Sequence, residues 1–344
     1  YQYKEKGQDD STYSSTVPVN AGEYTVKAIF AATKEYGEAT ATVDFTIAKA
    51  VVGLSMGSDL SKTYGDASFH VTAVHEGDGT VRYESSNQDV LTIDESGNVT
   101  LHHAGTATIT AVLSESANYL GAQTSIQVTV GKKQGSFTVS QDEYQVTYGT
   151  ADFSIAPQTK DGDGTVEYSS SDTKVATVDS DGKVHIVGAG DAVITMHMTD
   201  GTDYIGAEKQ VTIRVAKADG TGSVSLTGWI YGQSPKTPSA VSETNGVAEV
   251  TYQYKEKDAA DELYTAQIPT DAGNYTVKAT FAATENYNAV EAVADFTISK
   301  AAAELTLGEN IHKTYGDGAF TLTPSCNGNG TVHFVSSNPS VVSV

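Results

Sequence analysis

The sequence predicts an all-β chain made of several small β-sandwich domains in tandem. The chain repeats itself: its first 93 residues match its last 93 without a gap, at a displacement of 251 positions, and 45 of those 93 positions are identical. Apolar and polar residues alternate along several stretches with a period of two, which is typical of half-buried strands. No useful length of the chain shows a helical period. Such self-similarity indicates one small unit that is used repeatedly.

The first repeat type contains a long predicted strand followed by a closing strand. Residues 21–28 return with one substitution as residues 272–279, and residues 44–47 return as residues 295–298. The apolar positions of the long strand are Tyr24, Val26, Ala28 and Phe30 in one copy and Tyr275, Val277, Ala279 and Phe281 in the other. Lys27 and Lys278 alternate with these positions, so we expect both lysines to face solvent.

The second repeat type opens with a tyrosine-glycine turn, seen at Tyr64-Gly65, Tyr148-Gly149 and Tyr315-Gly316. Residues 77–81 and 162–166 then share the sequence Gly-Asp-Gly-Thr-Val, and each Asp-Gly pair predicts a hairpin because these residues tolerate positive φ angles. A clear alternation follows, with apolar residues at Ala107, Ile109, Ala111 and Leu113 and again at Ala192, Ile194, Met196 and Met198. Short strands with Gly, Asp and Asn turns and many β-branched residues indicate an all-β sandwich.

The repeats divide the chain into five predicted domains. They are a partial repeat of the first type at 1–48, complete repeats of the second type at 51–131 and 134–216, a complete repeat of the first type at 219–299, and a partial repeat of the second type at 302–344. Because the two partial repeats lack different parts of different types, we expect the sequence to be a portion of a longer polypeptide.

Composition limits the partners that the chain can have. A formal charge of −22, from 43 acidic against 21 basic residues, disfavours nucleic acid and anionic membranes, which would be repelled at long range. No apolar run approaches the roughly 20 residues of a membrane span. Cys326 is the only cysteine, which excludes an intrachain disulfide, and we expect it to be structural.

Two motif sets resemble known bacterial families. Residues 85–110, with Ser85-Ser86-Asn87, Ile93-Asp94 and residues 104–110, resemble the bacterial immunoglobulin-like domain of group 2, found in intimin and invasin relatives, and residues 169–195 repeat them. The other type, with residues 228–232 and 271–279, resembles the Tyr-Gly-type, mucin-binding-like repeats of Gram-positive surface proteins. These resemblances imply tandem immunoglobulin-like β-sandwich domains, and they say little about a ligand because fold does not fix function.

Candidate chemical sites are few. The histidines are His70, His75, His102, His103, His185, His197, His312 and His333, and none is spaced as a ligand pair; His102 and His103 should point to opposite strand faces. Acidic turns at 76–78, 161–163, 179–181 and 200–203 offer oxygen ligands, so calcium stays an alternative to plain turn chemistry. We therefore expect no catalytic, cofactor-binding or metal-binding residues and no cofactor, with calcium as the one open alternative.

Two further alternatives involve lysine and tyrosine. An isopeptide bond at Lys27 or Lys278, of the kind that strengthens some stalk domains, would need a buried lysine. Sugar stacking on aromatic rings would use some of the 19 tyrosines or Trp229, the only tryptophan, but most tyrosines alternate with polar residues as core positions do.

The expected function is that of a non-catalytic stalk or spacer in a long bacterial cell-surface, cell-wall or secreted repeat protein, an adhesin. The alternatives are a module that binds a host glycan or protein through its end loops, and an accessory region of a large secreted glycoside hydrolase. Linkers of three residues should place neighbouring repeats of the chain end to end. Each linker carries a lysine that we expect to meet acidic loops, at Lys49, Lys132, Lys217 and Lys300.

Overall fold

The computed structural model describes all 344 residues, and its fold is all-β. The only helices are two single 3-10 turns, η1 (Asp10–Thr12) and η2 (Asp261–Leu263). This confirms the predicted fold class of tandem β-sandwich domains. The chain divides into two compact units, one formed by Tyr1–Tyr144, Ala151–His185 and Asp191–Ile213 and the other by Gln145–Thr150, Ile186–Gly190 and Arg214–Val344. Every sheet uses strands from only one of the five predicted repeats, whose boundaries stay a prediction.

The first repeat forms one antiparallel sheet in the order β1-β2-β3. Its strands are β1 (Gln2–Glu5), β2 (Gly22–Phe30) and β3 (Ala39–Ile47). The β2–β3 ladder runs from Gly22 opposite Ile47 to Phe30 opposite Ala39, so the predicted alternation is realised along the whole strand. Tyr24 is buried, whereas Phe30 at the far end of β2 is 54% exposed.

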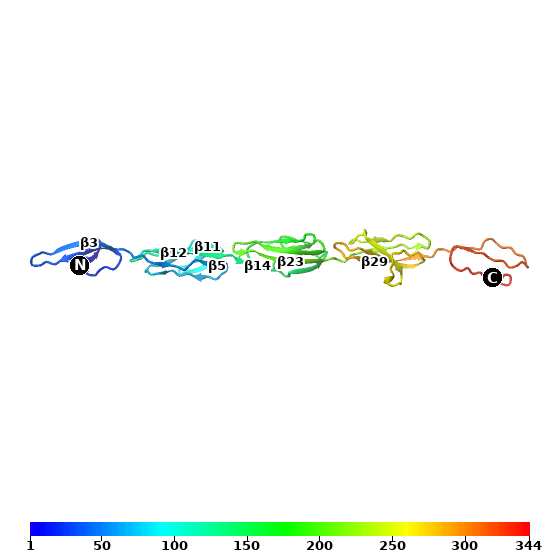
Figure 1. The fold of residues 1–344 in the computed structure, drawn as a ribbon, viewed down its shortest axis with the longest axis horizontal. Helices are drawn as coiled ribbons and strands as arrows, with labels where there is room; N and C mark the ends of the chain where they lie inside the picture. The colour runs from blue at the N-terminus through cyan, green and yellow to red at the C-terminus, as the bar shows by residue number, and fades with distance from the viewer. The chain divides into compact units, whose positions relative to one another are not determined.

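The second repeat contains a four-stranded and a three-stranded sheet, in the orders β5-β12-β11-β8 and β6-β10-β9, and a two-stranded pair β4–β7. The cyan part of the ribbon in Figure 1 shows β5, β11 and β12 together. Its strands are β4 (Leu54–Ser55), β5 (Leu60–Thr63), β6 (Phe69–His70), β7 (Val74–His75), β8 (Val81–Ser85), β9 (Leu91–Ile93), β10 (Asn98–Leu101), β11 (Gly105–Leu113) and β12 (Ala122–Gly131).

The core of the second repeat lies between these two sheets. Leu91 and Val99 from the smaller sheet and Ile109 and Val128 from the larger sheet are completely buried in it. All four apolar positions predicted for β11 are buried, as its period of two requires. The opening strand β5 pairs in parallel with the closing strand β12, from Leu60 opposite Val128 to Thr63 opposite Gly131.

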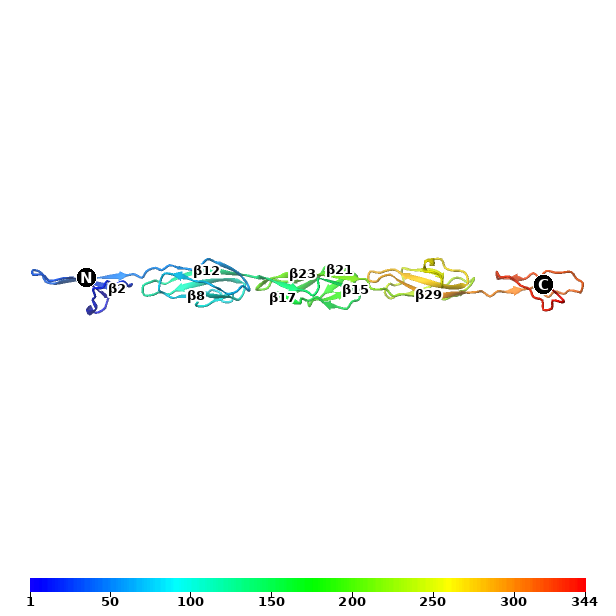
Figure 2. The same cartoon turned by 90° about the horizontal axis from the view of Figure 1, so that it is seen from below.

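The third repeat has the same arrangement, with sheets in the orders β15-β23-β21-β18 and β16-β20-β19 and pairs β14–β17 and β13–β22. Figure 2 shows β15, β17, β21 and β23 in the green part of the ribbon. Its strands are β13 (Lys133–Gln134), β14 (Ser136–Thr138), β15 (Glu143–Thr147), β16 (Phe153–Ser154), β17 (Thr159–Asp161), β18 (Val166–Ser170), β19 (Ala176–Val178), β20 (Lys183–Ile186), β21 (Gly190–Met198), β22 (Tyr204–Ile205) and β23 (Ala207–Ala216).

The fourth repeat has a four-stranded sheet in the order β25-β29-β28-β27 and a pair β24–β26. Its strands are β24 (Ser223–Ser225), β25 (Trp229–Ile230), β26 (Ser239–Val241), β27 (Val250–Glu256), β28 (Gly273–Phe281) and β29 (Val290–Ser299). Trp229 is buried and stacks on Phe296 with 5.4 Å between ring centroids. The fifth repeat has only a short pair, β30 (Leu305–Thr306) with β31 (Ser325–Cys326).

Two local predictions were wrong. The Asp78-Gly79 turn does not close a hairpin, because β7 pairs with β4 and β8 pairs with β11. The Asp163-Gly164 turn does not close one either, because β17 pairs with β14 and β18 pairs with β21. Neither Gly79 nor Gly164 has a positive φ; a Cβ added at Gly79 would lie 2.2 Å from the carbonyl oxygen of Ser114, so close approach explains that glycine. His102 and His103 lie in the turn between β10 and β11, so the prediction of opposite strand faces does not apply to them.

Candidate functional site

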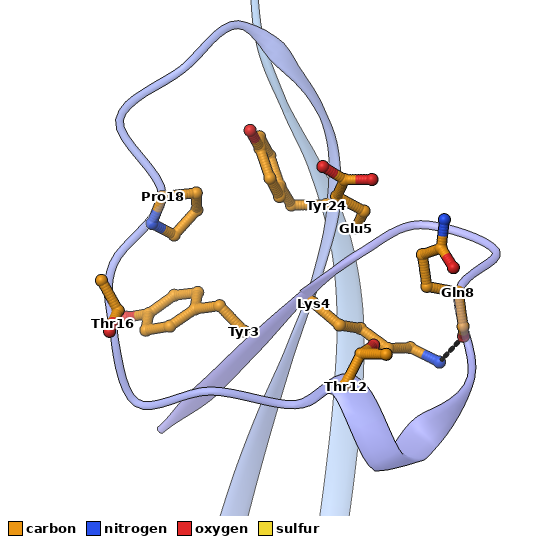
Figure 3. A pocket seen from close by; sticks show the side chains of 8 residues that line it. All are labelled: Tyr3, Lys4, Glu5, Gln8, Thr12, Thr16, Pro18 and Tyr24. Carbon is orange, nitrogen blue, oxygen red and sulfur yellow. Dashed lines mark hydrogen bonds between the residues drawn. The ribbon is translucent and has the colours of Figure 1, made fainter.

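A shallow hollow lies beside the 3-10 turn of the first repeat. Its volume is about 340 Å³, and its wall contains Tyr3, Lys4, Glu5, Gln8, Thr12, Thr16, Pro18 and Tyr24. Figure 3 shows Tyr24, Pro18 and Tyr3 along one side of this hollow, while Lys4 extends toward Gln8 on the other side. The site therefore combines two phenol rings with charged and hydroxyl groups.

The fourth repeat has a hollow of about 300 Å³ at the corresponding place. Tyr254, Lys255, Glu256, Pro269 and Tyr275 in its wall stand 251 positions after Tyr3, Lys4, Glu5, Pro18 and Tyr24. The recurrence shows that the hollow belongs to the first repeat type and not to one irregular loop.

Backbone pairing holds the loop that forms each hollow. Tyr3 and Ser14 exchange N–H···O=C bonds of 2.6 and 2.8 Å, and Tyr254 and Thr265 exchange bonds of 2.7 and 2.9 Å. The hydroxyl of Tyr24 donates to the carbonyl of Asn20 at 3.0 Å, and that of Tyr275 donates to the carbonyl of Asp271 at 3.1 Å. These bonds fix the loop at both ends, so the hollow is formed before any ligand arrives.

A lysine–tyrosine cluster occupies the face of the sheet opposite the core. Lys255 Nζ lies 5.0 Å and Lys278 Nζ 4.6 Å from the ring centroid of Tyr264. Lys4 and Lys27 lie 5.0 and 4.9 Å from the ring of Tyr13 in the same way. The expectation that Lys27 and Lys278 simply face solvent is corrected here, because the tyrosine of the η loop covers both; the side chain of Lys278 is 18% exposed.

The most buried lysines of this cluster are held as cations. Lys255 Nζ donates to Asp261 Oδ1 at 2.7 Å and to the carbonyl of Ala259 at 2.6 Å. The bond to Asp261 raises the pKa of Lys255, and the same bond lowers the pKa of Asp261. Lys4 has the matching bond to Asp10 Oδ1 at 2.6 Å, which raises its pKa. A protonated amine is not a nucleophile, so these bonds do not favour an isopeptide bond at Lys4 or Lys255. The isopeptide alternative at Lys27 or Lys278 stays a prediction.

The histidines make separate structural contacts. His185 Nδ1 lies 2.7 Å from Asp152 Oδ1, and the contact with His185 is the largest cause of the lowered pKa of Asp152. His103 Nδ1 lies 2.8 Å from Asp203 Oδ2. The chain contains no group of three or more His, Cys, Asp or Glu side chains arranged to hold a metal ion.

Carboxylates of two acidic turns bond to backbone N–H groups, one in a neighbouring loop and one in its own loop. Asp163 Oδ2 accepts the backbone N–H groups of Thr202 and Asp203 at 2.8 and 2.9 Å, and these bonds lower the pKa of Asp163. Asp179 Oδ1 accepts the N–H groups of Asp181 and Lys183, both at 2.9 Å. Turn chemistry therefore uses these oxygens, and the prediction that calcium is not needed stays open to experiment.

The linker lysines bond mainly to carbonyl groups. Lys49 pairs with the carboxylate of Glu115, as predicted, and also donates to the carbonyl of Ser116 at 2.7 Å. Lys132 and Lys217 instead donate to the carbonyls of Gly201 and Thr284, both at 2.6 Å. Lys132 thus meets the acidic turn 200–203 as expected, but through a backbone carbonyl and not through a carboxylate. Cys326 is exposed and free, and its structural role stays a prediction.

The family model of the intimin immunoglobulin-like domain matches two parts of the chain, residues 70–114 and 157–202. The matched parts cover β6 to β11 of the second repeat and most of the corresponding strands of the third. The match supports bacterial immunoglobulin-like repeats. It does not extend to the first repeat type, so the mucin-binding-like resemblance of that type stays a prediction. The search of curated proteins gave no match to this sequence.

Solved structures with a similar arrangement come from several surface proteins. Drosophila N-cadherin EC1-4 is 12% identical, with a TM-score of 0.30, over 84% of this chain and 85% of that one. Domains 4 and 5 of the S-layer protein SbsC are 20% identical, with a TM-score of 0.23, over 48% of this chain and 100% of that one. A SusE-like surface-located polysaccharide-binding protein from Bacteroides thetaiotaomicron is 11% identical, with a TM-score of 0.21, over 80% of this chain and 64% of that one. Likenesses this distant carry no functional argument.

Sequence reasoning missed the hollow and the lysine–tyrosine cluster. A signal was present, because residues 1–6 and 252–257 share the sequence Tyr-Gln-Tyr-Lys-Glu-Lys without a change. Alternation alone assigned their faces but not the loop that covers them.

The structure contains no helix long and apolar enough to cross a membrane.

Proposed function

We propose that this chain is a non-catalytic spacer region of a long bacterial surface or secreted repeat protein, an adhesin exposed at the cell surface or wall. The observation that carries the proposal is that successive repeats share the same fold and the same kind of linker. The second and third repeats have the same strand order in both sheets, and each of their short linkers is fixed by a lysine that bonds to the following repeat. Repeated units that differ little suit a spacer, whose purpose is length. The intimin-type family match supports a surface location.

Small-angle scattering of the whole chain tests the spacer proposal. Units of roughly 35 to 40 Å, set by strands of six to eight residues and their end loops, should give a maximum dimension well over roughly 100 Å. The value should persist in high salt, because short linkers and apolar contacts do not depend on screening. A radius of gyration near roughly 20 Å, as expected for one compact body of this length, would contradict the proposal.

A second candidate function is recognition of a surface glycan or host protein through the hollow of the first repeat type. The observation that favours it is the recurrence of the hollow with the same two tyrosines, proline, lysine and glutamate in two repeats. The hydroxyl, amide and charged groups of the two walls suit the hydroxyl groups of a sugar or the polar groups of a protein.

A glycan array probed with the intact chain tests this second function. Thr16 and Gln267 occupy corresponding exposed places in the two walls, so the double variant Thr16→Arg and Gln267→Arg should abolish saturable binding. The matched control is Gln123→Arg with Gln127→Arg, which adds the same charge on exposed positions of β12. Equal binding by the two double variants would exclude the hollow as the binding site.

A further inference from the structure

A side-chain oxygen crosses from one repeat to the preceding one at three places in the chain. The Oδ1 atoms of Asn118, Asp203 and Asn286 accept the backbone N–H groups of Ala21, Ala104 and Ala189 at 2.8, 2.7 and 2.8 Å. In each case the two partners belong to the same compact unit. Each alanine precedes the glycine that begins the long central strand of its repeat, and each Asn or Asp precedes a tyrosine.

The same Asn or Asp also holds the linker with its own backbone. The carbonyls of Asn118, Asp203 and Asn286 accept the N–H groups of Ala50, Lys133 and Ala218, each at 2.9 Å. The residue therefore bonds to its linker through the main chain and to the preceding repeat through the side chain. Together these bonds fix both sides of the linker.

The tyrosine that follows adds an aromatic contact. The ring of Tyr204 meets that of Tyr64 edge to face, with 5.5 Å between centroids, and the ring of Tyr287 meets that of Tyr148 at 5.4 Å. Tyr64 and Tyr148 belong to the tyrosine-glycine turns that open their repeats. The N–H groups of Tyr64 and Tyr148 donate to Gly131 and Ala216 at the ends of the closing strands, at 2.8 and 2.9 Å. The turn thus places its ring beside the linker.

The arrangement does not depend on repeat type. It joins a second-type repeat to a first-type repeat at Asn118, two second-type repeats at Asp203, and a first-type repeat to a second-type repeat at Asn286. Asp203 is the one charged member; it is 6% exposed and its carboxylate also meets His103. The shared feature is an acceptor oxygen before a tyrosine, which we name the Asx-Tyr loop.

The fourth repeat has a preformed but unoccupied copy of the receiving surface. Tyr231 donates its N–H to Ser299 at 2.8 Å, as Tyr64 and Tyr148 do at their own closing strands. Its ring is 51% exposed, whereas Tyr64 and Tyr148 are half-buried. Ala272 is exposed, whereas Ala21, Ala104 and Ala189 are half-buried. Residues 302–344 correspond to residues 51–93, a range that does not include Asn118 or Tyr119.

We infer that the Ala-Gly start of the central strand and the ring of the tyrosine-glycine turn form a docking surface for an Asx-Tyr loop of the next repeat, whatever its type. At the fourth repeat this surface consists of Ala272, Gly273 and Tyr231, and its occupant is an Asx-Tyr loop from a second-type repeat. Three examples in the same chain show the hydrogen bond to the alanine, and two of them also show the ring contact, which together define the chemistry of the occupant. The inference does not rest on the spacer proposal, because it concerns which contact joins repeats and not what the joined chain does.

Amide hydrogen exchange in the full chain tests the occupied surfaces. Asn286→Ala should lower the protection of the Ala189 amide by about five- to tenfold, the effect of one lost hydrogen bond. Asn286→Asp should restore it, because Asp203 shows that a carboxylate serves in this place. Asn288→Ala is the matched control, since its side chain contacts Lys217 and Asp219 at 3.5 and 3.4 Å and does not reach the third repeat.

The outcomes separate coupling from simple loss of folding. Amides of β28 report whether the fourth repeat stays folded, and they should be unchanged in all three variants. An Ala189 amide that is unaffected by Asn286→Ala, or equally exposed in Asn286→Asp and Asn286→Ala, would overturn the inference. If protection of the β28 amides falls in Asn286→Ala, the test is made instead with Asn118→Ala. The exchange of the Ala21 amide is then the measurement.

A chimera tests the unoccupied surface. Replacing residues 302–344 with residues 51–131 keeps the alignment of the fifth repeat and supplies the Asn118-Tyr119 loop. Protection of the Ala272 amide should rise by about five- to tenfold, and Asn118→Ala in the added copy should remove this rise. A folded added repeat, judged by amides of its copy of β11, with an unchanged Ala272 amide would contradict the predicted docking. If the added copy does not fold, the Asn286 and Asn118 variants decide the inference.

Discussion

The first and fourth repeats contain nearly the same strands in different surroundings. β2 and β28 differ at only two of nine positions, yet Phe30 is 54% exposed and its counterpart Phe281 is completely buried. In the fourth repeat the segment before β27 covers the sheet, with Leu226 and Trp229 in the core beside Phe296. A Cβ added at Gly222 would lie 2.6 Å from the ring of Phe281, so the backbone there passes directly over that ring. Residues 1–48 of the first repeat correspond to residues 252–299, a range that does not include this covering segment. The strands alone thus form the sheet, and the covering segment makes the core.

The largest expected difference is in amide hydrogen exchange. Amides of β28 should exchange only with unfolding of the whole repeat, which costs about 5 to 15 kcal/mol in typical domains. Amides of β2 should exchange by local opening at a small fraction of that free energy, because an uncovered sheet face is solvated. The fifth repeat should behave like the first. Equal protection of β2 and β28 in a monomeric sample would contradict this comparison.

Truncation of Phe30 and Phe281, which occupy corresponding positions, tests the difference in burial between the two repeats directly. Phe281→Ala should destabilise the fourth repeat by about 3 to 5 kcal/mol, from lost burial and the cavity that remains. Phe30→Ala should cost less than about 1 kcal/mol, because the ring is already half in water. Trp229, the only tryptophan, reports the unfolding of the fourth repeat by fluorescence, and exchange of β2 amides reports the first.

Similar losses in the two variants would mean that Phe30 is buried in solution. That outcome would imply that another part of the molecule, or another copy of it, covers the first repeat. A sedimentation measurement on the same sample distinguishes these two explanations.

Asp44 of the first repeat and Asp295 of the fourth repeat occupy corresponding positions and provide a smaller test. Thr25 donates to Asp44 at 2.7 Å and lowers its pKa most, whereas Lys257 lies 2.8 Å from Asp295 and lowers that pKa most. Lys257→Met should therefore raise the pKa of Asp295 more than Lys6→Met raises that of Asp44, as measured by NMR titration of the carboxyl groups.

The sign of the pH effect follows from the direction of these shifts. A carboxyl group whose pKa is lowered by folding stabilises the folded state above its ordinary pKa, and this contribution disappears as the pH falls through the folded value. Acid should thus weaken both repeats slightly. Equal responses of Asp44 and Asp295 to the two lysine variants would show that the lysine contacts are not formed in solution.

The smallest expected effect is that of removing calcium. EDTA should leave the melting temperature of the chain unchanged, because the carboxylates of Asp163 and Asp179 already bond to backbone N–H groups. A fall of several degrees that added calcium reverses would show a structural ion. The double variant Asp163→Asn with Asp179→Asn would then identify whether the turns of the third repeat hold it.

Periodicity predicted the faces of the strands well. Ala107, Ile109, Ala111 and Leu113 are all buried, and so are the four matching residues of β21. Periodicity does not tell which distant segment covers a face, so the rings of Tyr13 and Tyr264 over the lysines were not predicted. It also cannot tell which strands pair, because a glycine placed for close approach, such as Gly79, has the same sequence signal as one placed for a hairpin.

The parallel pairing of opening and closing strands has a consequence for tension. The chain enters the second repeat through β4, passes into β5 and leaves the repeat through β12. Strands β5 and β12 lie side by side in the same direction over four residue pairs. A pull on the two ends would slide β5 and β12 past each other along their common axis, so the hydrogen bonds between them would be loaded in shear and would have to break together. The fourth repeat repeats this geometry, with Trp229 opposite Ile298. Each such repeat would therefore resist stretching at the place where force enters and leaves it.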